Sequence, residues 1–275
     1  LGYTFYRSLR IISLPARGGE SARPVPPLEQ RDFILPDTGV IKLVTRTGQG
    51  RRVILVTKAG HNDGHHSHTD VGTFIVNVDG ESLLPDAGRG YYSKDYFRRA
   101  RYDNIFNNSY SHNLPRIAGK LQAPGPEFGG RGQFHGSIVD HGQRGEAKYV
   151  VIDFHAAYNL PDLRGARRTL ELDTRTGAVT LTDEFTFADR PLPVEEAFNT
   201  WSQVEVDGPR ARICGEKSAL DLEIIEPSGA VFAVESLAEA CRENAIEGTL
   251  RRLSAALPDG ATRFALRIVP GEPGL

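Results

Sequence analysis

The chain has 275 residues, with 33 Lys and Arg against 35 Asp and Glu and a formal net charge of -2. This balance argues against a nucleic-acid-binding protein, because phosphate binding needs a clear basic excess or patch. No apolar run reaches membrane-spanning length, and the number of residues allows one or two domains with a large core.

The first thirty residues differ in character from the rest. Residues 1–13 fit either a short helix or a short strand, and residues 15–27 are rich in Pro, Gly, Arg and Ser, which is typical of a linker. Because the chain begins at Leu1 and contains no methionine, we expect it to be a piece of a longer protein. From Phe33 onward, turn residues separate short apolar runs, which predict antiparallel strands at residues 33–35, 40–44 and 53–56.

Residues 60–92 hold an unusual concentration of imidazole and carboxylate groups. Histidines and aspartates are interleaved there: His61, His65, His66 and His68 with Asp63, Asp70 and Asp86. Imidazole nitrogen and carboxylate oxygen are ligands of a borderline metal such as zinc. If the segment is extended, His66, His68 and Asp70 share one face at a period of two. The alternative is a polar surface loop without a metal.

A hairpin is predicted directly after these histidines. Residues 73–78 and 81–86 have the pattern of two strands, and Asp79-Gly80 is the two-residue turn favoured in tight hairpins. A regular ladder would set Asp86 opposite Thr73 rather than His68. A metal site that joins Asp86 to the histidines therefore requires a bend near Gly72 or Gly88, where glycine permits unusual backbone angles.

Residues 91–102 alternate aromatic and basic side chains. Four tyrosines lie among Arg98, Arg99 and Arg101, and this composition suits an acidic carbohydrate, because aromatic faces stack on sugar rings and guanidinium groups pair with carboxylates or sulfates. The alternative is a surface loop with tyrosines that face the core. Downstream, His112 stands alone among the small polar residues 107–113.

The remaining sequence predicts strands almost throughout. Glycine or proline turns separate the expected strands, with one short helix at residues 236–244, and the strands lie at residues 149–154, 167–173, 178–187, 197–206, 211–214, 220–226, 231–236 and 263–269. Many short strands with few short helices predict an all-β fold, a large antiparallel β-sandwich of stacked sheets over residues 31–275. Cys214 and Cys241 lack metal-knuckle spacing, so we expect two reduced, buried thiols, with a disulfide as the alternative.

These motifs together resemble a known family. The array of His66, His68, Asp70, Gly72 and Phe74, followed by residues 84–88 and 107–113, resembles the C-terminal domain of the heparinase II/III family of polysaccharide lyases. Residues 167–170 and 183–185 look like the next strands of that domain. The resemblance runs from about Phe33 to the end of the chain.

The resemblance implies a metal site and a catalytic residue. Zinc would be held by His68, Asp86 and His112 in a mainly structural role, and His66 would lie at the substrate cleft as a catalytic residue. His65 occupies a position where several members have an asparagine, and we take it as a substrate-binding candidate, together with Arg98, Arg99 and Arg101.

The resemblance also implies an architecture and an activity. Such enzymes carry an N-terminal toroid of paired helices, and they cleave uronic-acid polysaccharides, heparan sulfate-like or alginate-like, by β-elimination. The toroid supplies a catalytic tyrosine, so we expect this chain to be an incomplete C-terminal part, with residues 1–30 as a remnant of the toroid or a linker. A periplasmic or secreted location, an acidic polysaccharide partner and a homodimer are further expectations.

Two other classes remain open from the sequence. A cupin is a small β-barrel whose first motif also carries two histidines near a carboxylate, although residues around His112 do not supply its second motif cleanly. A carbohydrate-binding module without chemistry would fit the same strands.

Overall fold

The described strands form three antiparallel sheets, of five, nine and four strands. The computed structural model describes residues 30–64, 66–92, 94, 96, 99–125 and 132–273, so the expected linker, His65 and Arg98 lie outside the described residues. The five-stranded sheet has the order β1 (Phe33–Leu35), β2 (Val40–Arg46), β3 (Arg52–Lys58), β5 (Phe74–Val78) and β6 (Glu81–Leu84). The four-stranded sheet has the order β16 (Ala233–Ser236), β17 (Arg251–Ala256), β12 (Val194–Thr200) and β7 (Arg116–Ile117).

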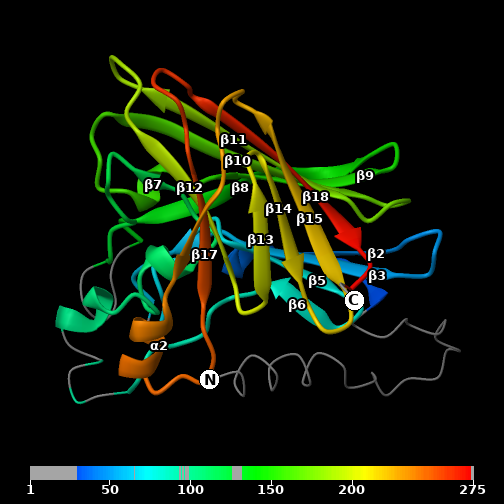
Figure 1. Cartoon of the computed structure of the whole chain (residues 1–275). Helices are drawn as coiled ribbons and strands as arrows, with labels where there is room; N and C mark the ends of the chain where they lie inside the picture. The colour runs from blue at the N-terminus through cyan, green and yellow to red at the C-terminus, as the bar shows by residue number, and fades with distance from the viewer. Residues whose placement is uncertain are drawn as a thin grey trace, which may run out of the picture.

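The nine-stranded sheet runs across the whole molecule (Figure 1). Its order is β13 (Gln203–Asp207), β14 (Arg210–Cys214), β15 (Ala219–Glu226), β18 (Arg263–Gly271), β11 (Val179–Phe187), β10 (Leu163–Asp173), β9 (Ala147–Asp153), β8 (His135–Arg144) and β4 (Gly60–His61). The helical elements among the described residues are short: α2 (Ala238–Glu243) and the 3-10 turns η2 (Pro36–Thr38), η3 (Arg99–Asp103), η4 (Ser109–Ser111) and η5 (His155–Ala157).

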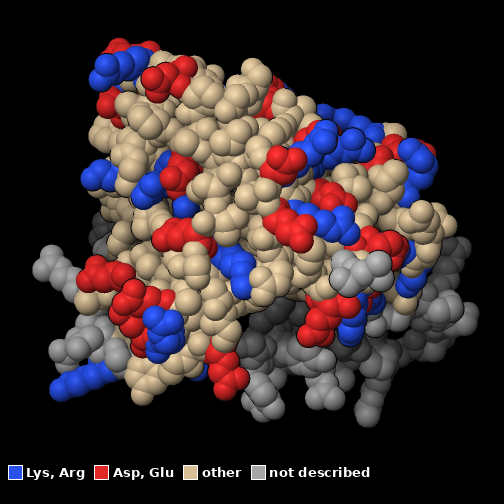
Figure 2. All heavy atoms as spheres, in the orientation of Figure 1, with Lys and Arg blue, Asp and Glu red and all other residues tan. Residues whose placement is uncertain are grey.

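The prediction of an all-β sandwich is confirmed. Each sheet has an open strand order in the described part of the chain, so the barrel that the cupin alternative requires is not formed. No helix in the described ranges has the length and apolarity needed to cross a bilayer. On the face shown in Figure 2, basic and acidic side chains are interleaved rather than gathered into a patch of one sign.

Several strands differ from the sequence prediction. Residues 197–206 were expected to form one strand, but the chain bends at Trp201-Ser202, so that β12 and β13 belong to different sheets. Strand β8 was not predicted because its sequence, HGSIVDHGQR, is polar and exposed and lacks the apolar alternation of a half-buried strand. Strand β17 was also missed, since two arginines begin it and its apolar side chains are small.

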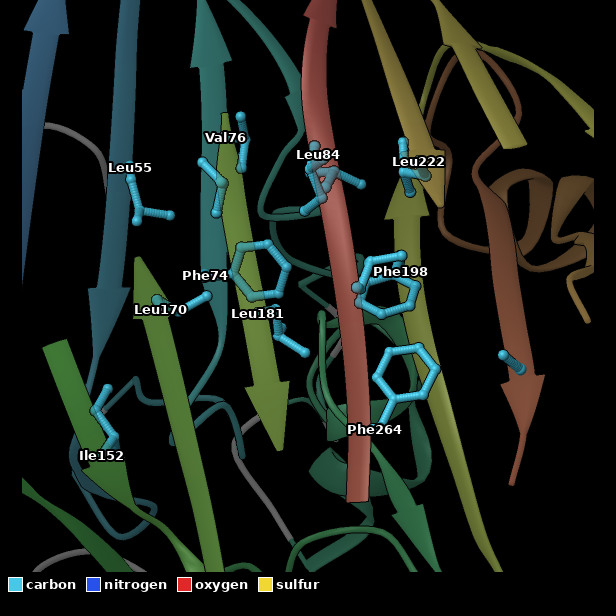
Figure 3. Close-up of a cluster of buried hydrophobic side chains, with 14 of the residues drawn as sticks. Leu55, Phe74, Val76, Leu84, Ile152, Leu170, Leu181, Phe198, Leu222 and Phe264 are labelled. Atoms are coloured by element: carbon cyan, nitrogen blue, oxygen red, sulfur yellow. The ribbon is translucent and has the colours of Figure 1, made fainter. Parts of the chain in front are cut away.

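The main core lies where the three sheets meet (Figure 3). In β3 and β10, buried residues alternate with partly exposed ones, as expected for strands with one solvated face. The five-stranded sheet contributes Leu55, Phe74 and Val76, which face Leu170 and Leu181 of the nine-stranded sheet. These apolar faces supply the main driving force for stacking the sheets.

Phe198 of β12 joins the four-stranded sheet to this core. The side chain is fully buried, with ring centroids 6.3 Å from Phe74 and 6.1 Å from Phe264. Replacing Phe198 with alanine should lower the free energy of unfolding by about 3–5 kcal/mol, because burial is lost and a cavity remains. Urea unfolding at an unchanged m-value would measure this loss. Phe187→Ala, at a partly exposed ring, is the matched control, and an equal loss there would contradict the assignment.

Glu81 ties the hairpin to the nine-stranded sheet. Its carboxylate accepts hydrogen bonds from the backbone N–H groups of Glu216, Lys217 and Ser218 at 2.7, 3.0 and 3.0 Å. Burial alone would raise the pKa of Glu81, but these donors favour the charged form and hold the pKa below its ordinary value. The start of β6 is therefore fixed in place, and β6 leads directly to Asp86.

A second, smaller core anchors the segment that follows Asp86. Its buried members are Ala87, Phe106, Leu237, Cys241 and Leu250, and the ring of Trp201 stacks on Phe106 with centroids 6.5 Å apart. Cys241 is buried and Cys214 half-buried, and both are free thiols, as expected for reduced cysteines.

Candidate metal centre

The hairpin and the loop before it adopt the conformations that a metal site requires. Asp79 and Gly80 both have positive φ values, 52° and 94°, as in the predicted tight turn. Gly72 and Gly88 have φ values of 88° and 83°, and the β5–β6 register shifts between Val76 and Asn77. The bend that the sequence required is therefore present.

The prediction that His66, His68 and Asp70 share one face of an extended segment is wrong. Residues 62–73 form no strand in the described part of this segment, and His66 has a φ of 63°, which is the left-handed region. Period-two alternation does not apply to an irregular loop. Tertiary contacts of the loop, rather than alternation along a strand, determine where the side chains of His68 and Asp70 lie.

Two buried amide side chains hold this loop. Asn62 accepts from the N–H of Asp70 at 3.2 Å and donates to Gln122 Oε1 at 3.1 Å. Gln122 in turn accepts from the N–H of Val71 at 3.1 Å and donates to its carbonyl at 2.6 Å. Since buried polar groups that are fully paired give one defined arrangement, the backbone next to Asp70 is rigid.

His112 lies at the centre of the candidate site. It follows η4, whose N-cap Asn108 accepts from the N–H of Tyr110, and its side chain is fully buried. Its Nε2 lies 3.3 Å from Nδ1 of His68, and its Nδ1 lies 3.6 Å from Oδ2 of Asp86. Donor atoms of Asp70, Asp86 and His112 all lie within 4.8 Å of one another.

These residues fit a zinc ion. Zinc–nitrogen and zinc–oxygen bonds of about 2.0–2.2 Å place neighbouring ligand atoms of a tetrahedron about 3.4 Å apart, close to the separation of His112 and Asp86. The buried Nδ1 of His112 also has no hydrogen-bond partner in the described structure. One cation can use only one nitrogen of His112, and His68 and Asp86 approach different nitrogens of this ring. Asp70 is the third member of the compact donor group with Asp86 and His112.

Burial and neighbouring charges shift the pKa values of His68 and Asp70. Burial, reinforced by His112, lowers the pKa of His68 from 6.5 to about 4, so its imidazole is neutral at pH 7. Burial would raise the pKa of Asp70, but the Lys58 ammonium 2.5 Å away outweighs it, and the pKa lies below its ordinary value. Asp70 is therefore a carboxylate with one oxygen already paired to Lys58.

This shift predicts a pH dependence of stability in the metal-free chain. The folded pKa of His68 is about 4 and the unfolded value 6.5, so between these values the unfolded state binds more protons. Stability should thus fall as the pH drops from 6.5 toward 4, by up to ~3 kcal/mol from this group. Urea unfolding across this range would measure it. His68→Gln should flatten the curve, and an unchanged slope in that variant would contradict the assignment.

The other predicted site residues are placed as follows. His66 is exposed, at the surface of the loop that precedes the metal ligands. Arg101 is buried, donates to the carbonyl of Ser67 at 2.6 Å and lies over the rings of Tyr96 and Tyr102, which favours a role in holding the loop. Arg99 lies in η3, and His65 and Arg98 fall outside the described residues.

The chain is similar to a known protein family. The profile of the family described as heparinase II/III-like, C-terminal, matches residues 29–257. The chain belongs to this family. A comparison with curated proteins gave no match.

Solved structures of heparinases share the fold of this heparinase II/III-like domain. The heparan sulfate lyase HepC from Pedobacter heparinus matches 98% of this chain with a TM-score of 0.69 and 12% identity, and the chain covers 41% of that protein. A heparinase III structure matches 89% of this chain with a TM-score of 0.67 and 15% identity, and the chain covers 37% of it. The chain therefore spans well under half of these proteins, and the similarity at such identities is one of fold.

Three residues important to the centre were not singled out for these roles from the sequence. Lys58, Asn62 and Gln122 surround Asp70, but each is an ordinary polar residue in its local sequence. No spacing rule connects Gln122 to a loop some fifty residues earlier. Asp70 itself was recognised as a potential ligand but was not part of the set that the family resemblance implied.

Proposed function

We propose that this heparinase II/III-like domain forms the metal-bearing part of a polysaccharide lyase that cleaves a uronic-acid-containing polymer by β-elimination. The observation that carries the proposal is the grouping of donor atoms of Asp70, Asp86 and His112 within 4.8 Å of one another, with Nδ1 of His68 3.3 Å from Nε2 of His112. Proteins of this fold include a heparan sulfate lyase and heparinase III, so a heparan sulfate-like polymer is the first substrate to test and an alginate-like polymer the second.

The ion at this site is proposed to be zinc, with a mainly structural role. Asp86 and His112 would be ligands together with Asp70, the third member of the compact donor group, and His68, which the family resemblance implies, would be a fourth. When bound, zinc would supply a positive charge that fixes the hairpin to the loop after it. A set of four protein ligands would close the coordination shell, as in structural zinc sites.

The chemistry would be carried by residues beside the metal rather than by the metal. β-Elimination removes the proton next to the uronate carboxylate and protonates the departing glycosidic oxygen, and charge builds on the carboxylate as the proton leaves. A neutral histidine within reach of that proton is a suitable base. His66 is exposed two residues before the metal ligand His68, so the loop would present its imidazole to a bound polymer.

The activity is tested by the ultraviolet absorbance of unsaturated uronate. The longest polypeptide that contains this domain should produce this absorbance with heparan sulfate or alginate, and elemental analysis should find one zinc per chain. Polymer binding without any unsaturated product would instead support a carbohydrate-binding module. Absence of zinc from a protein purified without chelating agents would contradict the metal assignment.

A further inference from the structure

A buried arginine lies directly beneath the candidate metal centre. Arg168, on β10, is fully buried, and its guanidinium carbon lies 5.4 Å from the ring centroid of Phe74 and 5.6 Å from that of Phe154. Fully buried arginines are rare unless they are paired. This one extends from the nine-stranded sheet toward the loops that carry the metal ligands.

A single nitrogen of this guanidinium connects the two ligand-bearing segments. Nη1 of Arg168 donates to the carbonyl of Gly72 at 2.8 Å and to the carbonyl of Asn113 at 2.6 Å. Gly72 is two residues after Asp70, and Asn113 directly follows His112. One planar group therefore spans these two stretches of backbone.

The rest of the guanidinium is fixed by carboxyl groups of the core. Nε donates to Oδ1 of Asp183 at 2.9 Å and Nη2 to Oδ2 at 2.5 Å, which is the two-pronged geometry that arginine makes with a carboxylate. Nη2 also lies 3.3 Å from Glu196, and all three side chains are fully buried. Arg168 consequently has little freedom to follow a movement of the loops.

A second group holds His112 from the same side. The side-chain amide of Asn199 donates to the carbonyl of His112 at 2.9 Å, and its backbone N–H donates to Oδ1 of Asn113 at 2.7 Å. Asn113 also contacts the other segment, because its amide donates to the carbonyl of Phe74 at 2.7 Å. The backbone of His112 is thus fastened to β12 as well as to Arg168.

We propose that Arg168 is a positioning residue for the metal centre: it holds the Asp70 and His112 segments at the separation that one cation requires. This inference rests on the proposed zinc site. Metal affinity depends on groups that orient the ligands, and removal of such groups weakens binding about 10–100-fold. Arginine is required because lysine, a single point charge, cannot bind Asp183 in two-pronged geometry and reach both carbonyls.

The test compares zinc binding by the unsubstituted chain, Arg168→Lys and Arg252→Lys. Arg252 is also a buried arginine, and it pairs with Glu195 and packs over Tyr110. Within the described residues it donates to no carbonyl of either ligand-bearing segment. Zinc affinity is measured at a temperature where every variant is folded, and cobalt is used in parallel because its visible spectrum reports ligand geometry. We expect Arg168→Lys to bind zinc at least tenfold more weakly, with an altered cobalt spectrum, and Arg252→Lys to bind within twofold.

Each outcome decides the proposal. Equal affinity and an identical cobalt spectrum in Arg168→Lys would overturn it while leaving the zinc site standing. No zinc in the unsubstituted chain would overturn both this inference and the proposed metal centre. If Arg168→Lys does not fold, the double variant Arg168→Gln with Asp183→Asn replaces it, because it removes the guanidinium without leaving the Asp183 carboxylate unpaired. Zinc affinity unchanged in that variant would overturn the proposal.

Discussion

Replacing His112 with alanine should remove zinc from this domain. His112 belongs to both ligand sets that the geometry allows, the one with His68 and the one with Asp70. Structural zinc sites bind with about 10–16 kcal/mol shared among their ligands, so the loss of one ligand should cost ~3 kcal/mol or more, at least a hundredfold in affinity. Elemental analysis of the purified protein and titration with a zinc indicator would measure this loss.

Two further variants identify the remaining ligands. His68→Ala should weaken zinc binding strongly if its ring turns toward the ion, and Asp70→Ala should do so if the ion takes the compact group of Asp70, Asp86 and His112. His141→Ala is the matched control, because His141 is an exposed histidine on β8. Full zinc occupancy in His112→Ala would show that the convergence of these residues is not a metal site.

Replacing His66 with alanine should abolish turnover and leave zinc in place. General base catalysis typically contributes about 10²–10⁴-fold to a rate, and the loss should approach this range if His66 removes the proton. The measurement is the rate of unsaturated uronate formation by the longest polypeptide that contains this domain, with zinc determined on the same sample. Lyase activity that survives the substitution would take His66 out of the catalytic machinery.

A second substitution separates chemistry from backbone conformation. His66 has a left-handed backbone, which asparagine tolerates better than alanine. If His66 acts as a base, His66→Asn should be as inactive as His66→Ala. Recovery of activity in His66→Asn would instead show that the loop conformation, rather than the imidazole, is what turnover requires.

The fold was predictable because its signals are local. Apolar alternation marks strands such as β3 and β10, and Asp79-Gly80 marks the tight turn. Strands without that alternation were missed, as β8 shows. The division of residues 197–206 between two sheets depends on which surfaces they cover, and a sequence pattern does not record this.

The candidate site was predictable in its residue types but less so in its geometry. The resemblance implied His68, Asp86 and His112. In the structure His68 and Asp86 lie near different nitrogens of His112, and the compact donor group is Asp70, Asp86 and His112. The extended conformation assumed for the histidine loop was wrong, because long-range partners fix that loop. Asn62 and Gln122 lie 60 residues apart and bind through their side chains, so neither is identifiable from its neighbours.

Local opening of the small core around Phe106 and Cys241 would let an ion leave the candidate metal centre without unfolding of the whole domain. This core contains few buried apolar side chains and is separate from the main core, so its opening should need less free energy than global denaturation. Because Ala87 belongs to it, such opening would carry Asp86 away from His112 while Arg168 keeps His112 on the sandwich. Amide hydrogen exchange around Phe106 should therefore follow the rate at which a chelator extracts the ion.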